Sequence, residues 1–411
     1  MPGRFEAKKQ KHPLRKPALW VLCAILALAV LAGAVWALTH EGPSMPSAEL
    51  EPTAAEASAP AEAPAPPPTR DLAPEIIGPS DAPGEPDAAG ESAPAEAPAV
   101  QSLTLMAVGD NLIHNTVYWS AQLPDGSYDF TPFYQDIAPV AAAYDLACIN
   151  QETILVHDPA LYDNYPRFGS PEAVGDAVAA AGFNIVTHAT NHCYDKGDTG
   201  ILDSVSFWRT RHPDVTMLGI HDTEADAQTL RVVEKNGLRV ALLNYTYGLN
   251  YELPANRWMV DILDRDKVTA DVRSARQQAD FVVVFVHWGE EGSFTPDQTQ
   301  RDWAALFASL NVDAVIGAHP HVLQPLESIA RADGRQMPVF YSLGNFLSHQ
   351  MSAEQMLGGL ASLRLVKDET GTRVEDAELL PTVNFLSHSE TGPLWSYRPM
   401  LLRDYTDVMA A

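Results

Sequence analysis

Residues 312–324 read VDAVIGAHPHVLQ, a run of small and β-branched residues that passes directly into two histidines separated by one proline. A short apolar run bounded by turn residues is typical of a buried strand, and its alternation with helical stretches elsewhere in the chain predicts an α/β fold. His319 and His321 follow this strand, so we expect both side chains to lie near its carboxyl end.

Five further apolar runs end in the same way, in residues that can bind metals or form hydrogen bonds. The runs and the residues after them are 103–108 with Asp110 and His114, 145–149 with Asn150 and Glu152, 183–187 with Asn191, His192 and Asp195, 281–286 with His287 and Glu290, and 339–342 with Asn345. Ligands bind beyond the carboxyl ends of strands in open α/β sheets. We therefore expect these side chains to converge on one site.

Two helix starts can be predicted between the apolar runs. Thr295, Pro296 and Gln298 form a capping-box pattern with proline at the first helical position. Ser170, Pro171 and Glu172 predict a second helix start, and Gly182 predicts the end of that helix.

The residue types in this set favour a divalent transition metal. Imidazole, carboxylate and amide oxygen together suit one or two ions of Mn, Fe or Zn, and the chain has only three cysteines, which argues against a structural zinc site. Asp110 after a glycine is also typical of a plain turn. His114 is equally compatible with the exposed face of a first helical turn.

Charge is distributed unevenly along the chain. Of the net charge of −26, residues 1–16 contribute +5 and residues 41–100 contribute −11, which leaves −20 for residues 101–411 because residues 17–40 are uncharged. Such an acidic surface repels nucleic acid and attracts cations. We therefore expect no nucleic-acid partner.

The N-terminal hundred residues predict an anchor and a tether. Residues 1–16 form a basic cytoplasmic tail, and residues 17–40 include an uncharged stretch that as a helix would be about 33 Å long, enough to span a bilayer. The basic flank places the C-terminal part outside the plasma membrane. A cleaved signal peptide is the alternative. Residues 41–100, rich in Pro, Ala and Glu, predict a disordered linker before a folded domain over residues 101–411.

From about residue 103 to about residue 350 the sequence resembles the CapA family of poly-γ-glutamate capsule synthesis proteins. The resemblance rests on the pair Gly109–Asp110, the triplet 150–152, the stretch 181–197 with Asn191 and His192, and the motifs 287–290, 317–324 and 341–346. It implies a fold similar to the calcineurin-like metallophosphatases, a layered α/β/β/α sandwich. It also implies a set of metal ligands, namely Asp110, Glu152, Asn191, His287, His319 and His321.

The same resemblance implies roles for further residues. His192 would protonate a leaving group or stabilise charge, and Asp195 would orient it. Asn150, Glu290 and Asn345 would contact substrate, and Arg167 could hold a carboxylate or phosphate, although a surface arginine is equally typical. Calcineurin-like enzymes usually carry a histidine where this chain has Leu112, so His114 could be an extra ligand. Thr190 and Gly292 also depart from the family pattern.

Three alternative functions are compatible with these sequence features. The first is an extracellular metal-dependent hydrolase or transferase that acts on a phosphate ester or on the amide bonds of an anionic, polyglutamate-like envelope polymer. The second is a non-catalytic accessory subunit of a membrane synthase that elongates or exports such a polymer. The third is metal-free acid–base chemistry by His192 and Asp195.

Overall fold

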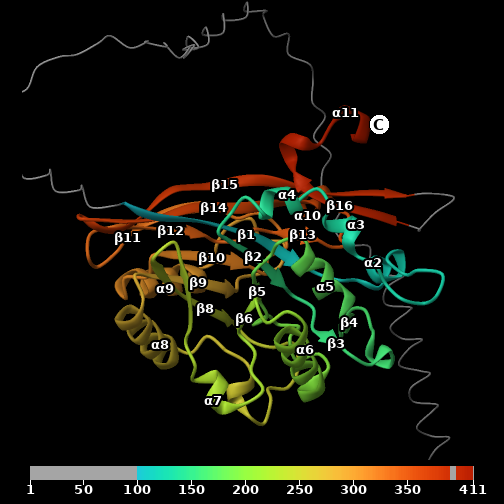
Figure 1. Ribbon diagram of the computed structural model, residues 1–411, viewed down its shortest axis with the longest axis horizontal. Helices are drawn as coiled ribbons and strands as arrows, with labels where there is room; N and C mark the ends of the chain where they lie inside the picture. The colour runs from blue at the N-terminus through green and yellow to red at the C-terminus, as the bar shows by residue number, and fades with distance from the viewer. Residues whose placement is uncertain (1–99, 389–394, 411) are drawn as a thin grey trace, which may run out of the picture. The chain divides into compact units, whose positions relative to one another are not determined.

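The computed structural model describes residues 100–388 and 395–410, and they form a sandwich of two β-sheets with helices on both outer faces (Figure 1). This arrangement confirms the predicted α/β fold and its layers. The predicted basic tail, anchor and linker, residues 1–16, 17–40 and 41–100, lie outside the described residues. Within the described residues, every helix is too short or too polar to cross a bilayer.

The first sheet has eight strands. Its parallel half contains β1 (Gln101–Asn111), β2 (Leu146–Gln151), β5 (Ile185–Thr187) and β6 (Thr216–Leu218). On the other side of β1 run the antiparallel strands β14 (Leu357–Asp368), β15 (Gly371–His388) and β16 (Trp395–Leu401), and β13 (Asn345–Leu347) pairs with the end of β1. Strand β1 therefore lies in the middle of the sheet.

The second sheet has six strands. Its centre is parallel and contains β8 (Leu238–Thr246), β9 (Phe281–His287), β10 (Ala314–Ala318) and β12 (Gln336–Phe340). Both edges are antiparallel, with β7 (Arg231–Lys235) beside β8 and β11 (Leu326–Ala330) beside β12. The run that forms β8 was not among the six predicted strands.

Alternating residues of β1 divide the core into layers. Leu105 and Ala107 pack between the two sheets, while Met106 and Val108 pack toward the helices α5 (Ala173–Ala180) and α6 (Gly197–Arg211). On the opposite outer face, α8 (Arg265–Gln278) and α9 (Gln298–Ser309) cover the six-stranded sheet (Figure 1). A period of two along a strand places successive side chains on opposite faces.

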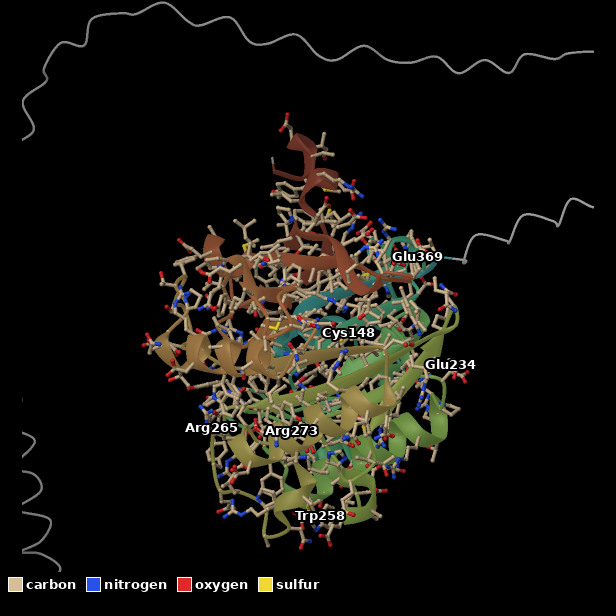
Figure 2. The ribbon with its side chains drawn as sticks, turned by 90° about the vertical axis from the view of Figure 1, so that its left-hand side faces the viewer. Cys148, Glu234, Trp258, Arg265, Arg273 and Glu369 are labelled. Carbon is tan, nitrogen blue, oxygen red and sulfur yellow. The ribbon has the colours of Figure 1, made fainter. Side chains whose placement is uncertain are left out.

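Both cysteines of the described domain are buried and unpaired, as expected for small core residues. Cys148 belongs to the core between the sheets and lies in the interior of the molecule, whereas Arg265 and Arg273 of α8 lie toward its outside (Figure 2).

The remaining helices are short: α2 (Asn115–Ser120), α3 (Thr131–Tyr134), α4 (Ala138–Ala141), α7 (Glu224–Ala227), α10 (Ala353–Met356) and α11 (Asp407–Ala410).

Both predicted helix starts are shifted along the chain. The capping box of α9 is formed by Asp297, which accepts from the Gln300 amide at 2.7 Å, and not by Thr295 with Gln298. Ser170 and Pro171 form the short strand β4, which pairs with β3 (Leu155–Val156). The hydroxyl of Ser170 donates to Thr153 at 2.8 Å, and the helix α5 begins after Glu172 without a side-chain cap.

Candidate metal centre

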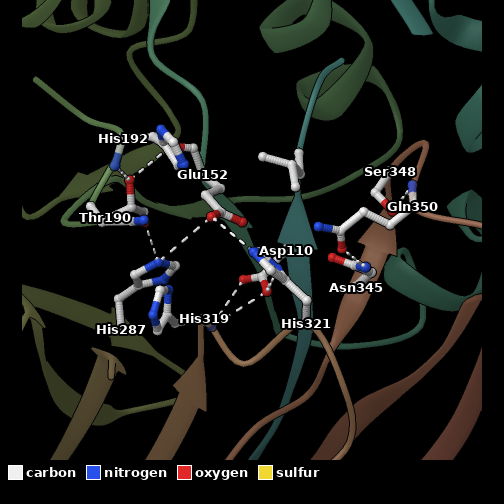
Figure 3. A network of polar contacts seen from close by, with 12 residues as sticks. Asp110, Glu152, Thr190, His192, His287, His319, His321, Asn345, Ser348 and Gln350 are labelled. Atoms are coloured by element: carbon white, nitrogen blue, oxygen red, sulfur yellow. Dashed lines mark hydrogen bonds and ion pairs between the residues drawn. The ribbon is translucent and has the colours of Figure 1, made fainter. Parts of the chain in front are cut away.

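The centre begins where β1 ends. Asp110 is fully buried, and its Oδ2 lies 3.0 Å from Nδ1 of His321 (Figure 3). Its Oδ1 accepts a hydrogen bond of 2.8 Å from the side-chain amide of Asn150, the residue aligned with Asp110 on β2. Both oxygens of this carboxylate therefore face fixed partners.

Glu152, just after β2, is the least satisfied side chain of the centre. It is fully buried, and neither carboxylate oxygen has a hydrogen-bond partner. Its Oε1 lies 3.7 Å from Nε2 of His287 and 3.7 Å from Nε2 of His321. Burial raises the pKa of Glu152 well above its usual range, with a further rise from Asp110 and an opposing effect from His321.

The three histidines follow β9 and β10. His287 ends β9, and its Nε2 lies 2.8 Å from Oδ1 of Asn191. His319 and His321 follow β10. Their backbone φ angles are 100° and 59°, in the left-handed region that residues with a Cβ rarely adopt. The Nδ1 atom of His319 is buried without a partner. This backbone turn directs two histidines separated by one residue into the same centre.

The pKa values of these histidines diverge. Burial, with a smaller effect from neighbouring histidines, lowers the pKa of His287 well below its usual range and that of His319 to about 3. Burial alone would also lower the pKa of His321, but Glu152 and Asp110 raise it to about 9. At neutral pH, His287 and His319 therefore present lone pairs, as metal ligands must.

Two groups of potential ligands overlap at one residue. Asp110, Glu152 and His321 form one group and Glu152, His287 and His319 the other, and within each group the ligand atoms lie within 4.8 Å of one another. Asn191 adds an amide oxygen to the second group through its contact with His287. Glu152 belongs to both groups, so its carboxylate faces two positions at which a metal ion could bind.

The residues fit a metal. Metal–ligand bonds of roughly 2.0–2.2 Å place ligand atoms about 3 Å apart, close to the separation of His287 from Asn191. The charges that act most strongly on Glu152 are those of His321 and of other acids, Asp110, Glu291 and Asp195. A buried carboxylate without hydrogen bonds requires a positive partner. A divalent cation would supply that charge.

An acid–base pair lies beside the ligands. Nδ1 of His192 is 2.6 Å from Oδ2 of Asp195, and both side chains are buried. The same Asp195 oxygen accepts a hydrogen bond from the Phe168 backbone amide at 2.8 Å. The rings of Phe168 and His192 pack edge to face, with their centroids 4.7 Å apart. Thr190 donates to the carbonyl of Glu152 at 2.7 Å and accepts from the His192 amide, which links the pair to the ligands.

Several predicted site residues have other positions. Asn150 contacts Asp110 and lies 3.4 Å from Nδ1 of His287, so it positions ligands and does not face substrate. Asn345 donates to Gln350 and to the carbonyl of Gln355 and is turned away from the ligands (Figure 3). These two side chains do not fit the expected substrate contacts.

Glu290, His114 and Arg167 lie around the centre. Glu290 is exposed, and the acid whose charge acts on Glu152 and His321 is its neighbour Glu291. His114 belongs to neither ligand group, and its Nδ1 lies 3.2 Å from both the Leu112 carbonyl and the His349 amide. Arg167 is exposed, with its guanidinium 4.0 Å above the ring of Tyr251.

Two asparagines of the site were missed by sequence reasoning. Asn244 accepts from the amides of His188 and Ala189 at 3.1 and 2.8 Å and fixes the start of the loop that carries Asn191. Asn250 contacts both Asn191 and His192 through its side chain. Asn244 lies near the carboxyl end of β8, which is an apolar run like the six predicted strands. A polar residue at the end of an apolar run therefore also marked Asn244 as a candidate site residue.

Fold and site together define a layered α/β protein with a strand-end centre suited to divalent metal ions. The family described as "Bacterial capsule synthesis protein PGA_cap" matches residues 104–350, and the chain belongs to this family, which confirms the resemblance to CapA. It is 28% identical over 260 residues to "Capsule biosynthesis protein CapA" of Bacillus anthracis, covering 61% of each chain. It is 29% identical over 191 residues to "PGA biosynthesis protein CapA" of Bacillus subtilis (strain 168), covering 46% of this chain and 49% of the relative.

The match thus spans about half to three fifths of the length of these curated relatives. Among solved structures, a "novel phosphatase" from Mycoplasma pneumoniae has a TM-score of 0.44 at 14% identity and covers 69% of this chain and 95% of its own. A hypothetical protein from Thermus thermophilus has a TM-score of 0.42 at 15% identity and covers 68% of this chain and 98% of its own.

Proposed function

We propose that this capsule synthesis family member is a metal-dependent hydrolase or transferase that cleaves or transfers a phosphate-ester or amide bond of an anionic envelope polymer. The observation that carries the proposal is the position of Glu152. Its carboxylate is buried without hydrogen bonds between two histidine-containing groups, next to the His192–Asp195 pair. A bound cation would supply the positive charge that favours an ionised carboxylate in that position.

The ligands divide between two ions. Asp110, Glu152 and His321 would hold one ion, and Glu152, Asn191, His287 and His319 would hold the other. The mixture of oxygen and imidazole donors suits Mn, Fe or Zn. Bound ions of this kind lower the pKa of water and polarise the bond under attack.

His192 and Asp195 provide the proton transfer. Asp195 accepts from Nδ1 of His192, so Nε2, which lies 3.3 Å from the side-chain amide of Asn250, is the ring nitrogen that would exchange a proton with a leaving group. The carboxylate also stabilises the imidazolium that forms, and Phe168 fixes both side chains from the same face. This pair gives the centre a proton donor separate from its ligands.

The location of the reaction extends the proposal. The uncharged stretch within residues 17–40 and its basic flank support a single-pass anchor in the plasma membrane, with residues 101–411 outside the cell on the 41–100 tether. The partners would then be a polyglutamate-like polymer and the membrane synthase subunits that make it. The family membership supports the connection with capsule polymer.

The test uses the purified full-length chain, stripped by chelation and reloaded with Mn, Fe or Zn. Phosphate esters and γ-glutamyl peptides are supplied as substrates, and His319→Ala is compared with a control, His157→Ala, whose side chain is 81% exposed. We expect metal-dependent turnover that His319→Ala abolishes and His157→Ala retains. Activity that ignores chelator and depends on His192 would indicate metal-free acid–base chemistry instead. Capsule production that survives His192→Ala with Asp195→Asn would indicate an accessory subunit.

A further inference from the structure

We propose that Arg167, supported by the ring of Tyr251, binds an oxyanion on the leaving-group portion of the substrate and so determines specificity. The inference rests on the proposed function, because it uses His192 as the proton donor to the leaving group. The ligand chemistry is a carboxylate or a phosphate, either of which a planar guanidinium binds through two parallel hydrogen bonds.

The guanidinium of Arg167 is held in place but left without an acid. It lies 4.0 Å from the ring centroid of Tyr251, a cation–π contact. Tyr251 is itself fixed, because its hydroxyl donates to the carbonyl of Pro166 at 3.1 Å. No carboxylate of residues 100–388 and 395–410 forms an ion pair with Arg167, whereas Lys196 in the same region pairs with Asp163. An exposed, oriented and unpaired cation is available for a ligand.

Arg167 and Tyr251 are each next in sequence to a residue that contacts His192, the proposed proton donor. Phe168 follows Arg167 directly, donates to Asp195, and packs its ring against His192. Asn250 precedes Tyr251, donates its backbone amide to the Asn191 carbonyl at 3.2 Å, and places its side chain against His192. Arg167 therefore lies on the His192 side of the centre, where a leaving group must be to receive a proton.

The loop that follows β9 carries negative charge next to the His319–His321 turn. Glu291 acts on Glu152, His321 and Tyr247, and its loop is attached to the His319–His321 turn by a hydrogen bond from the Gly292 amide to the Pro320 carbonyl at 2.8 Å. An anionic leaving group is repelled there and attracted toward Arg167. This difference in charge favours an orientation with the anionic leaving group beside Arg167.

The experiment measures dissociation constants by calorimetry for four probes on the metal-loaded full-length chain. The probes are phenylphosphonate, 4-carboxyphenylphosphonate, its neutral analogue 4-carbamoylphenylphosphonate, and benzene-1,4-bisphosphonate, whose P–C bonds the proposed hydrolase does not cleave during the titration. We expect the carboxylate to bind about tenfold more tightly than the carbamoyl analogue, the lower end of the range for a charge-assisted contact at an exposed site. A gain for the bisphosphonate alone would assign the oxyanion as phosphate.

Variants separate a specificity role from a structural one. Arg167→Gln should reduce the ratio of carboxylate to carbamoyl affinity to about one, Arg167→Lys should restore part of it, and Tyr251→Leu should lower it several-fold. The control Arg403→Gln, an exposed arginine elsewhere, should leave the ratio as in the wild type. If Arg167→Gln, with metal bound, changed neither the carboxylate-to-carbamoyl ratio nor the affinity for the probe with two phosphorus groups, this inference alone would be overturned. Absence of bound metal would overturn the proposed function and this inference with it, and absence of any phenylphosphonate binding would overturn this inference.

Discussion

Nδ1 of His192 lies 2.6 Å from Oδ2 of Asp195, and the same carboxylate oxygen accepts from the backbone amide of Phe168. The imidazole is therefore held by one buried acid whose own position is fixed by the neighbouring loop. An orientation of this kind is what proton transfer to a leaving group requires.

Asp195→Asn should lower kcat by roughly 10²–10⁴-fold, because the amide cannot stabilise the imidazolium form of His192. Metal content should remain that of the wild type, since Asp195 belongs to neither ligand group. Elemental analysis and steady-state kinetics on the same preparation check both statements. Asp198→Asn, whose carboxylate accepts from the exposed Tyr194 hydroxyl, is the control. A variant that kept wild-type kcat would remove Asp195 from the mechanism.

Asn150→Ala should weaken metal affinity by about 10–100-fold without removing any ligand. Its amide donates to Asp110 and lies against His287, so its loss frees one ligand of each group to rotate. Competition with a chelator of known affinity measures the change. Unaltered affinity would show that the two ligands are held by other contacts.

His114→Gln should keep the full metal complement, whereas His321→Gln should lose an ion. The Nδ1 of His114 is used by backbone groups of Leu112 and His349, while His321 faces Asp110 and Glu152. Metal analysis of the two variants side by side distinguishes them. If His114→Gln lost an ion, His114 would be a ligand in place of the histidine missing at Leu112.

A pH-dependent stability is expected at His221, away from the metal centre. Its ring contacts Asp226 at 3.2 Å and Asp261 at 2.9 Å, and although burial alone would lower the pKa, these acids raise it to about 9. The folded-state pKa is above the unfolded value, so the stabilisation is fully present below pH 6.5 and is lost as the pH rises toward 9.

His221→Gln should therefore destabilise the protein by about 3 kcal/mol near pH 6, and by much less above pH 9. Urea unfolding of wild type and variant across this range gives the difference, and His157→Gln serves as an exposed control. A difference between wild type and variant that did not change with pH would show that His221 is neutral in the folded protein.

The convergence of the candidate ligands could be predicted from the sequence because most of them lie at the end of an apolar strand or just after it. Parallel neighbours such as β1 and β2 end at the same edge, so Asp110 and Glu152 had to lie close together. Loop geometry was not predictable in the same way. Gly289 and Gly292 have positive φ angles of 94° and 76°, and the turn between them directs the charge of Glu291, not Glu290, at the centre.

Contacts between residues far apart in the sequence were also not predictable from sequence patterns. Asn250 reaches His192 from a loop 58 residues further along the chain, and no local pattern marks that contact. Asn345 follows its strand like the ligands do, yet its amide is engaged by Gln350 across a turn. The position of a polar residue after a strand thus predicts its neighbourhood, whereas the direction of its side chain depends on the loop that follows.

The metal content of the full-length chain and three variants tests the shared role of Glu152 most directly. After reconstitution and removal of free metal, we expect about two ions per wild-type chain, about one in His287→Ala and in His321→Ala, and almost none in Glu152→Ala, because only Glu152 belongs to both ligand groups. A wild type without metal, or a Glu152→Ala variant with the wild-type complement, would contradict this account.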